Sequence, residues 1–479
     1  MMRGAAGVCL VALGLAGCMV GPKYSRPAAL TAPADKGQLP PEFKESNGWK
    51  QAQPAEAALA EDWWRIFGNT ELDGLEAQVD VSNQAIKAAE AQFRQARAVV
   101  SESRAGLYPT ISTDPGIASA RNSHTAAGAN TALGPYGNFV LPFDLSYELD
   151  AWGRIRRSVA AAGAEMQATA ADLATVRLSM HAELAIDYFE MRSLDAQKQL
   201  LDNTLAVYRK ALDLNENRFQ GGLSSGAEVA QARTQLEATR AQSVDVGEAR
   251  AQFEHAIAIL AGRTPESLSL AEAPLTAEPP AIPTGIPSQL LERRADIAAA
   301  ERRMAAANEQ IGITQAAFYP DLQITAAGGF QGQTIVDWFQ WPSRFWALGP
   351  NAMQTLFDAG RRRAATAAAT AGYDAAVAGY RQDALNAFRE VEDSLAALRV
   401  LERESAAQRV AVEAAERSLA LSMNRYNGGL VTYLEVVVAQ STALSNERIE
   451  VDLLRRRMDA CVLLIKALGG GWDVSKLPG

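Results

Sequence analysis

The side chains that most often do chemistry are sparse in this chain of 479 residues. Its three histidines, His124, His181 and His255, stand far apart and have no metal-ligand spacing. The sequence contains no HExxH helix, no CxxC pair, no GxSxG, no P-loop and no dinucleotide-binding glycine fingerprint. We therefore expect no enzyme, no metal and no cofactor, and we expect each histidine to be a helix-face or loop residue.

The amino terminus has the pattern of a signal peptide that ends at a lipidated cysteine. Arg3 and a short apolar run precede Leu15-Ala16-Gly17-Cys18, which resembles the lipobox of bacterial lipoproteins. We predict a signal peptide over residues 1–17, cleavage before Cys18 and acylation of that residue. The alternative is an ordinary signal peptide with a chance cysteine. Met19, rather than an aspartate, follows Cys18, and by the same resemblance this favours the outer membrane.

The other two cysteines leave no intramolecular disulfide. Cys9 would be removed with the signal peptide, and Cys461 lies in an apolar helical run where we expect a small core residue. The mature chain is rich in Pro and Ala at its start. Because such sequence cannot bury much core, residues 18–60 are predicted to form an extended arm that leads away from the anchor.

Composition excludes further classes of protein. The chain is 48% hydrophobic, which suffices for a large core, and its net charge of −9 argues against nucleic acid as a partner. It contains no run of about 20 apolar residues, so no transmembrane helix is predicted.

A unit of about 200 residues occurs twice, which is far longer than the roughly 20–50 residues of a solenoid repeat. Two landmarks show it: Arg218-Phe219-Gln220-Gly221-Gly222-Leu223 returns as Arg425-Tyr426-Asn427-Gly428-Gly429-Leu430, and Leu107-Tyr108-Pro109 returns as Phe318-Tyr319-Pro320. The pattern indicates a tandem duplication. We place the first half at residues 61–262, a Pro-rich connector at 263–287, the second half at 288–470 and a tail at 471–479.

Two proline-free stretches, residues 154–218 and 361–426, predict very long helices. Both are rich in Ala, Leu, Gln, Glu and Arg, which favour helix. At 1.5 Å per residue each would span roughly 100 Å if continuous. The second has apolar residues at coiled-coil spacing, namely Phe388, Val391, Leu395 and Leu398. Helices this long without internal caps are typical of coiled coils or extended bundles.

The segments before these helices alternate between apolar and polar residues, as strands do. From Asn138 to Leu149 the odd positions are apolar and the even positions are mostly polar, and residues 321–331 alternate too. Residues 108–118 and 345–356 alternate poorly, and we predict strands there because the repeat places them opposite the clear ones. Each half then reads helix, strand, loop, strand, helix.

Four strands of about ten residues have the length to cross a bilayer in a tilted barrel. A membrane sheet must close because open edges do not survive in lipid, and about eight strands form the smallest well-filled barrel. We therefore expect an oligomer that closes the barrel. Aromatic residues cluster near the strands, as in interface girdles: Tyr136, Trp338, Phe339, Trp341, Phe345 and Trp346. The alternative is a soluble β-layer with ordinary core aromatics.

A glycine pair, Gly221-Gly222 or Gly428-Gly429, lies in each copy of the repeated turn and permits left-handed backbone. A capping-box pattern follows each pair, Ser225-x-x-Glu228 in the first half and Thr432-x-x-Glu435 in the second. On the residues alone, Glu228 and Glu435 are helix-capping carboxylates.

Over nearly its whole length the chain resembles the TolC-like outer-membrane efflux channels, in particular their lipoprotein branch, the OprM/NodT type. The resemblance rests on residues 18–27 (CMVGPKYSRP), on 63–68 (WWRIFG) with Leu72 and Leu75, and on 286–320, which begins IPSQLLERRADI and ends AFYP. It implies a mainly α fold with a small β part. In such a homotrimer twelve strands, four per chain, form an outer-membrane barrel continuous with a periplasmic α-helical coiled-coil tunnel.

The resemblance also implies roles at the periplasmic tip, where such channels are held shut. It places Glu435 in an acidic ring and Tyr426 as a packing gate residue, with Glu228 and Phe219 in the same region. Three copies of Glu435 would meet at the three-fold axis, where carboxylates select cations and titrate as a coupled set.

The chain departs from the family pattern at two tip positions. Val438 stands where members carry a second acidic residue, and Val431 stands where some carry a locking arginine. We therefore expect this gate to be held less by charge and more by packing.

The implied function is the outer-membrane exit duct of a tripartite efflux system for small molecules such as drugs. The duct would bind a periplasmic adaptor and, through it, an inner-membrane transporter of the RND type. One alternative is the exit duct of type I protein secretion. Another is a structural coiled-coil lipoprotein without a pore, which would not need the alternating strand at residues 138–149.

Overall fold

The computed structural model describes residues 19–27, 62–121, 135–282 and 290–478, and they form two compact units. The strand unit consists of Met1–Pro27, Phe93–Thr169 and Ala300–Tyr380, and the helical unit consists of Ala28–Gln92, Ala170–Ala299 and Arg381–Gly479. Each unit takes segments from both halves of the sequence. The duplication is therefore interleaved in space and does not give one unit per repeat.

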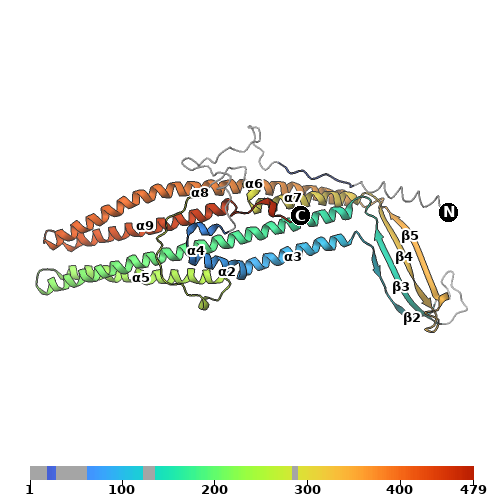
Figure 1. The fold of residues 1–479 in the computed structure, drawn as a ribbon, viewed down its shortest axis with the longest axis horizontal. Coiled ribbons are helices and arrows are strands. Elements are labelled where there is room, and N and C mark those ends of the chain that lie inside the picture. Colours follow the sequence, from blue (N-terminus) through green and yellow to red (C-terminus); the bar gives the residue numbers. More distant parts are fainter. Residues whose placement is uncertain (1–18, 28–61, 122–134, 283–289, 479) are drawn as a thin grey trace, which may run out of the picture. The chain divides into compact units, whose positions relative to one another are not determined.

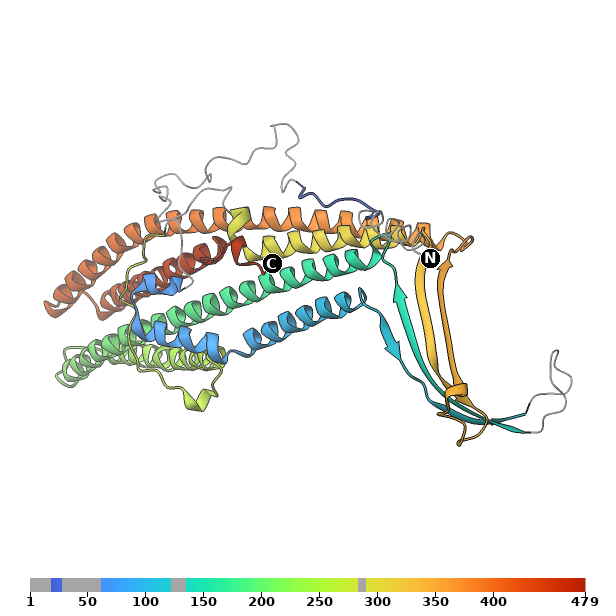
Figure 2. The same cartoon turned by 45° about the vertical axis from the view of Figure 1, so that its right-hand side comes forward.

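The strand unit contains an antiparallel sheet together with parts of four helices (Figures 1 and 2). Its strands are β1 (Thr110–Ser112), β2 (Gly116–Ala120), β3 (Tyr136–Glu148), β4 (Asp321–Gly332) and β5 (Arg344–Met353). β1 and β2 both pair with β3, β3 pairs with β4, and β4 pairs with β5. All four predicted strand regions are confirmed. The first is broken before Pro115, which has no N–H to offer to a sheet, and the last ends at Met353 rather than Leu356.

The register gives this sheet one polar and one apolar face. Asp144 pairs with Ser112 on one side and with Ala327 on the other, and paired residues share a face. The polar face carries Thr110, Ser112, Asp144, Ser146, Glu148, Gln323, Thr325 and Asn351. The apolar face carries Ile111, Leu141, Phe143, Leu145, Ile324, Phe330, Trp346 and Leu348. Trp346 is 82% exposed, so the described part of the chain leaves much of the apolar face uncovered.

Helices make up most of the rest of the described chain. They are α2 (Thr70–Ser82), α3 (Gln84–Ala105), α4 (Arg154–Gln220), α5 (Gly226–Leu260), α6 (Leu290–Arg293), α7 (Ala295–Ala316), α8 (Arg361–Asn427) and α9 (Tyr433–Ala467), with 3-10 turns such as η1 (Trp63–Phe67). α4 and α8 contain 67 residues each and confirm the two predicted long helices. α3, α4, α7 and α8 contribute residues to both units.

The helical unit has its main core where both halves meet. The predicted seam on α8 is part of this core, with Val391 and Leu395 fully buried and Phe388 packed against them. Cys461 is buried there too, as expected for a small core residue.

None of the helices in the described ranges is both long enough and apolar enough to cross a membrane.

Residues 19–27 form an extended strap that lies within the strand unit. Its hydrogen bonds run from Val20 N to Trp152 O (3.1 Å), from Arg157 Nη2 and Asn308 Nδ2 to Pro22 O (3.2 and 3.4 Å), from Tyr24 Oη to Glu301 Oε1 (2.5 Å) and from Arg26 Nη2 to Tyr380 Oη (3.2 Å). A Cβ on Gly21 would lie 2.6 Å from the Gly312 Cα, so only glycine permits this close approach. Cys18, the signal peptide and most of the predicted arm lie outside the described residues.

Candidate functional site

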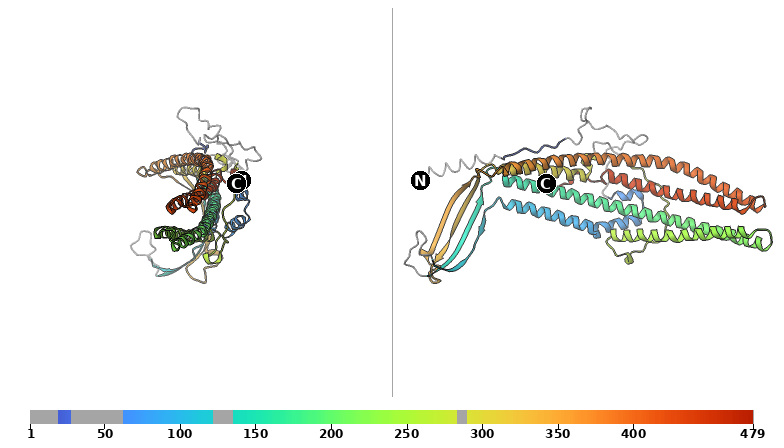
Figure 3. Two further views of the ribbon diagram at one scale, coloured as in Figure 1. Left: turned by 90° about the vertical axis from the view of Figure 1, so that its left-hand side faces the viewer. Right: turned by 180° about the vertical axis from the view of Figure 1, so that it is seen from behind.

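The repeated turns lie at the same end of the four long helices of the helical unit (Figures 1 and 3). One joins α4 to α5 and the other joins α8 to α9. In the first, Leu223 N donates to Arg218 O at 2.8 Å and Gly222 N donates to Phe219 O at 3.0 Å. This pair of bonds is a Schellman motif, which satisfies carbonyls at the end of a helix. The second turn repeats it through Leu430 and Gly429.

Only the second glycine of each pair uses the left-handed region. Gly222 and Gly429 both have φ of 71°, where a side chain would be strained. Gly221 and Gly428 have ordinary backbone, and a Cβ there would find its nearest neighbours at 3.5 Å. The sequence pattern is therefore confirmed, with the conformational requirement at one glycine per turn.

Tyr426 is the centre of a small core between the two hairpins. It is only 4% exposed and packs its ring against that of Tyr433, with centroids 5.3 Å apart. The Arg218 guanidinium of the first hairpin lies over the Tyr426 ring, 4.7 Å from its centroid. Apolar side chains complete this core: Ala211, Leu212, Ala232, Leu236 and Val436.

A buried hydrogen bond fixes Tyr426 in this core. Its hydroxyl donates to Asn215 Oδ1 on α4 at 2.6 Å. Asn215 is fully buried and donates its own amide to Ala211 O at 2.8 Å. Burial raises the pKa of Tyr426, so its hydroxyl remains a donor. The sequence pattern had not pointed to Asn215.

Glu228 joins the hairpins at a second point. Its carboxylate accepts from Ser224 Oγ at 2.5 Å and from Ser225 N at 3.3 Å, and Ser225 Oγ accepts from Glu228 N at 3.4 Å. The predicted capping box is confirmed. The other carboxylate oxygen accepts from Tyr433 N, at the start of α9, at 3.5 Å. The hydrogen bond from Ser224 and those from backbone N–H groups hold the pKa of Glu228 below its usual range.

The second predicted capping box is wrong. Thr432 precedes α9, but its side chain accepts no capping hydrogen bond. Glu435 instead receives a hydrogen bond from Arg425 Nη1 at 2.7 Å, and both side chains are well exposed. The physical reason is competition: a guanidinium within reach offers a charge-assisted bond that a backbone amide does not match. Glu435 thus stays partly exposed, with its carboxylate paired to the Arg425 guanidinium.

The remaining predicted tip residues divide by exposure. Phe219 is 51% exposed, and the side chain of Val438 is also exposed. Val431 is partly buried against the core around Tyr426. Val431 therefore adds apolar packing at the edge of this core.

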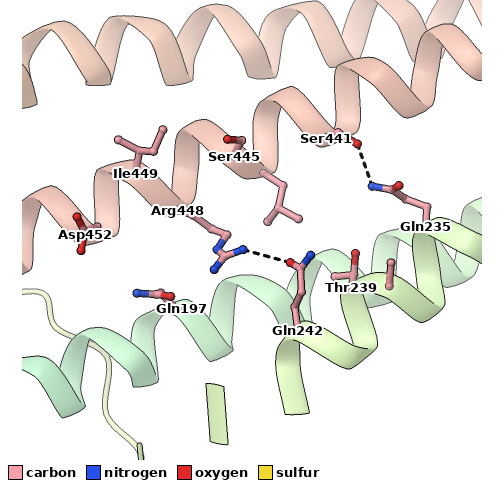
Figure 4. Close-up of a pocket in the computed structure, with 11 residues that line it drawn as sticks. Gln197, Gln235, Thr239, Gln242, Ser441, Ser445, Arg448, Ile449 and Asp452 are labelled. Carbon is pink, nitrogen blue, oxygen red and sulfur yellow. Dashed lines mark hydrogen bonds between the residues drawn. The ribbon is translucent and has the colours of Figure 1, made fainter. Parts of the chain in front are cut away.

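A polar hollow of about 580 Å³ lies farther along the same helices (Figure 4). Gln235 and Gln242 of α5 face Ser441 and Arg448 of α9 across it, and Gln197 of α4 also lines it. Gln235 Nε2 donates to Ser441 Oγ at 3.1 Å, and Arg448 Nη1 donates to Gln242 Oε1 at 3.2 Å. Such amides and hydroxyls suit reversible binding of a polar surface.

His181 differs from the expected helix-face residue. It is buried on α4, with Nδ1 at 2.7 Å from Glu76 Oε2, Nε2 at 3.2 Å from Asp80 Oδ1, and Trp64 stacked on its ring. Burial raises the pKa of Glu76 to about 7. Burial lowers the pKa of His181, but the two carboxylates outweigh it, so the net shift is upward. Across the described residues, no group of His, Cys, Asp and Glu is arranged to hold a metal ion.

Comparison with known proteins settles the family. A sequence profile of the outer membrane efflux protein family matches residues 77–263 and 286–470, one segment in each half of the chain. The chain belongs to the outer membrane efflux protein family. This efflux protein is 31% identical over 465 residues to the toluene efflux pump outer membrane protein TtgF of Pseudomonas putida, which covers 97% of this chain and 96% of that protein.

Two further comparisons agree. The efflux protein is 30% identical over 449 residues to the pyoverdine export outer membrane protein OpmQ of Pseudomonas aeruginosa, covering 92% of this chain and 93% of that protein. Its fold matches the outer-membrane channel OprN with a TM-score of 0.87 and 26% identity, covering 95% of this chain and all of that one. The predicted TolC-like, mainly helical fold, the outer-membrane location and the efflux role are confirmed.

Proposed function

We propose that this efflux protein is a passive, homotrimeric exit duct, and the sheet is the observation that carries the proposal. Its edges at β1 and β5 have no strand partner among the described strands, and its apolar face is exposed. Lipid cannot satisfy edge N–H and C=O groups, so the sheet must close on other strands. Three copies of four strand positions give twelve, which exceeds the roughly eight of the smallest filled barrel.

In this arrangement the apolar face contacts lipid, the polar face lines the exit path and the helices continue the path through the periplasm. Acylation at Cys18 adds an anchor in the outer membrane. The cargo consists of small molecules such as drugs or other toxic compounds, and relatives named for toluene and for pyoverdine support a chemically varied range. The duct performs no chemistry itself.

The partners are a periplasmic adaptor and, through it, an inner-membrane transporter of the RND type. The family relationship supports this assignment, because the relatives are outer-membrane components of pumps. The polar hollow between α5 and α9 offers the adaptor amide, hydroxyl and guanidinium groups near the tip.

The gate is the contact between the two hairpins at the tip. Opening requires α8 and α9 to separate from α4 and α5, which breaks the bond from Tyr426 to Asn215 and the bond from Tyr433 N to Glu228. Glu435 and Phe219 have exposed surface and would meet their symmetry copies. The free energy needed to open the gate then depends on how well the side chains around Tyr426 are buried. Glu435 sets the charge of the opening.

The trimer can be tested directly. The full-length protein, extracted in mild detergent, should yield covalent trimers with a lysine-reactive crosslinker and a trimer mass in native mass spectrometry. A monodisperse monomer that keeps its β-sheet circular dichroism signal would sink this architecture. Deleting the gene for this chain should lower the drug resistance of the cells. If the wild-type protein restores resistance and a variant that does not assemble fails to restore it, efflux depends on the trimer.

A further inference from the structure

A buried polar side chain interrupts the apolar face of α9 close to the tip. Gln440 is 1% exposed and lies between Val436 and Leu444, one turn before it and one turn after it on the same face of the helix. Val436 belongs to the core around Tyr426, and Leu444 belongs to a separate small core that α9 shares with α4 and α5. The Gln440 amide therefore stands where both neighbouring turns of α9 are apolar and packed.

Gln440 is buried without hydrogen bonds. Neither Nε2 nor Oε1 of its amide has a partner among the described residues. Burial raises the pKa of the nearby Tyr433 hydroxyl to about 12 and the Gln440 amide opposes this rise, yet the two groups do not reach hydrogen-bonding geometry. Leaving a buried amide unpaired costs free energy, because water would otherwise bind both of its polar ends.

Another buried amide of the tip is paired, so burial there does not by itself leave an amide without partners. Asn215 accepts from Tyr426 and donates to Ala211 O. A methionine, which is similar in length to glutamine, would fill the Gln440 position without a polar group to satisfy. The amide is therefore a source of instability in the closed arrangement that packing at this position does not require.

Opening of the tip would return this amide to water. Ser441 and Leu444, which are close to Gln440 on α9, both line the polar hollow between α5 and α9. Separation of α9 from α4 and α5 exposes the face that carries Gln440. Hydration of the amide then offsets part of the free energy that exposure of the apolar neighbours costs.

We propose that the buried amide of Gln440 destabilises the closed tip relative to the open one and so sets how readily the gate opens. The inference rests on the proposed gate, in which α8 and α9 separate from α4 and α5. The core around Tyr426 holds the two hairpins together, and Gln440 opposes it. The closed tip is then stable without being locked.

The test measures how often the core around Tyr426 opens in the full-length protein in mild detergent. Ala232→Cys places a thiol in this core, at a site 1% exposed, where a maleimide reacts only after the hairpins separate. At low reagent concentration the rate follows the population of the open state. Wild-type protein is the blank, because Cys461 is buried in the main core.

Gln440→Met should slow the reaction of the Ala232→Cys thiol roughly fivefold or more, because the closed tip no longer contains the unpaired amide. Gln408→Met is the matched control on α8. It removes an amide that has a partner, since Gln408 Nε2 donates to Asn446 Oδ1 at 2.9 Å, and it should not slow the reaction.

Hydrogen exchange gives the same information without an added cysteine. The Tyr433 N–H donates to Glu228 across the hairpins at 3.5 Å, so its exchange reports their separation. Gln440→Met should slow this exchange by a similar factor, roughly fivefold or more.

An unchanged or faster reaction in Gln440→Met would overturn the proposal, because the amide would then be neutral or stabilising in the closed tip. Failure of this variant to assemble, measured by native mass spectrometry, would overturn it for the same reason. The proposed gate itself has a separate test. If Tyr426→Ala does not speed the reaction of the Ala232→Cys thiol, the core around Tyr426 does not close the tip. If Tyr426→Ala speeds it and Gln440→Met does not slow it, the gate stands and only the role of Gln440 is lost.

Discussion

The Tyr426 hydroxyl donates to Asn215 Oδ1 at 2.6 Å, and both side chains are buried. The bond connects the last turn of α8 to α4, and so connects the two halves of the duplicated chain. Because the Asn215 amide is held by Ala211 O, its oxygen is turned toward Tyr426. This contact holds the two hairpins of the tip together without using exposed charges.

We expect Tyr426→Phe to loosen the tip and Tyr426→Ala to loosen it more. The phenylalanine keeps the ring but leaves Asn215 Oδ1 buried without a donor, which costs about 1–3 kcal/mol. The alanine also removes the packing against Tyr433. Single-channel recordings in planar bilayers should show low conductance for the wild type and stepwise higher conductance for the two variants. Tyr108→Phe, at a site 71% exposed, is the control; no increase in either Tyr426 variant would remove Tyr426 from the gate.

Glu435→Gln should reduce the cation preference of the channel and leave the turn folded. Thr432 does not use Glu435 in a capping box, and the exposed ion pair with Arg425 contributes at most about 1 kcal/mol. The measurement is the reversal potential in a salt gradient. Glu416→Gln, on α8 away from the turn, is the matched control. If both variants keep wild-type selectivity, Glu435 has no role in the pore.

The two glycines of each turn should respond differently to alanine. Gly222→Ala and Gly429→Ala force a Cβ into left-handed backbone and should destabilise the local turn by about 1 kcal/mol. Gly221→Ala and Gly428→Ala should be near neutral. Hydrogen exchange at Leu223 and its counterpart in the second turn reports the difference. Equal exchange in all four variants would contradict the assigned backbone.

Cys18→Ala should abolish acylation but leave some assembled trimer, because the barrel itself holds the protein in lipid. Metabolic labelling with palmitate measures the first effect and crosslinking measures the second. Label retained in the variant would show that Cys18 is not the modified residue.

The docking of α2 onto α4 should weaken as pH rises. The pKa of Glu76 is raised to about 7 by burial, and the pKa of His181 is raised by its carboxylate neighbours. The native state therefore binds more protons than the unfolded state from about pH 4.5 upward through 7, and stability falls with pH in that window. Asp73 and Asp80 add negative charge in the same direction.

Hydrogen exchange of Thr70–Ser82, corrected for intrinsic rates, should be faster at pH 8 than at pH 6. Glu76→Gln should flatten this dependence because it removes the main titrating group while keeping a hydrogen-bonding side chain. Glu90→Gln, which changes an exposed pair with Arg177, is the control. A pH dependence that persists in Glu76→Gln would assign the effect elsewhere.

Local patterns predicted what depends on local physics. The absence of proline from residues 154–218 and 361–426 predicted α4 and α8, and alternation predicted β3 and β4. The glycine pairs predicted the turns because φ near 71° strongly favours glycine. Resemblance to a family added the tip and its partners.

Contacts between distant segments were not predictable in this way. Asn215 has nothing in its own helix to mark it as the partner of Tyr426, and Thr432 followed a capping pattern that Arg425 overrides by binding Glu435. His181 looked like a helix-face residue because Glu76 is 105 positions away. Each case depends on which side chains the fold brings together.

The strap also imposes an order in time. Residues 19–27 leave the ribosome early, yet Tyr24 and Arg26 bind Glu301 and Tyr380, which are separated from them by 277 and 354 positions. The hydrogen bonds from Tyr24 and Arg26 cannot form until α7 and the first part of α8 have been made and folded. Closing such long loops is slow compared with forming local turns. The early-synthesised residues 19–27 are thus among the last to reach all of their contacts, and a chain truncated before Tyr380 would lack the hydrogen bond from Arg26.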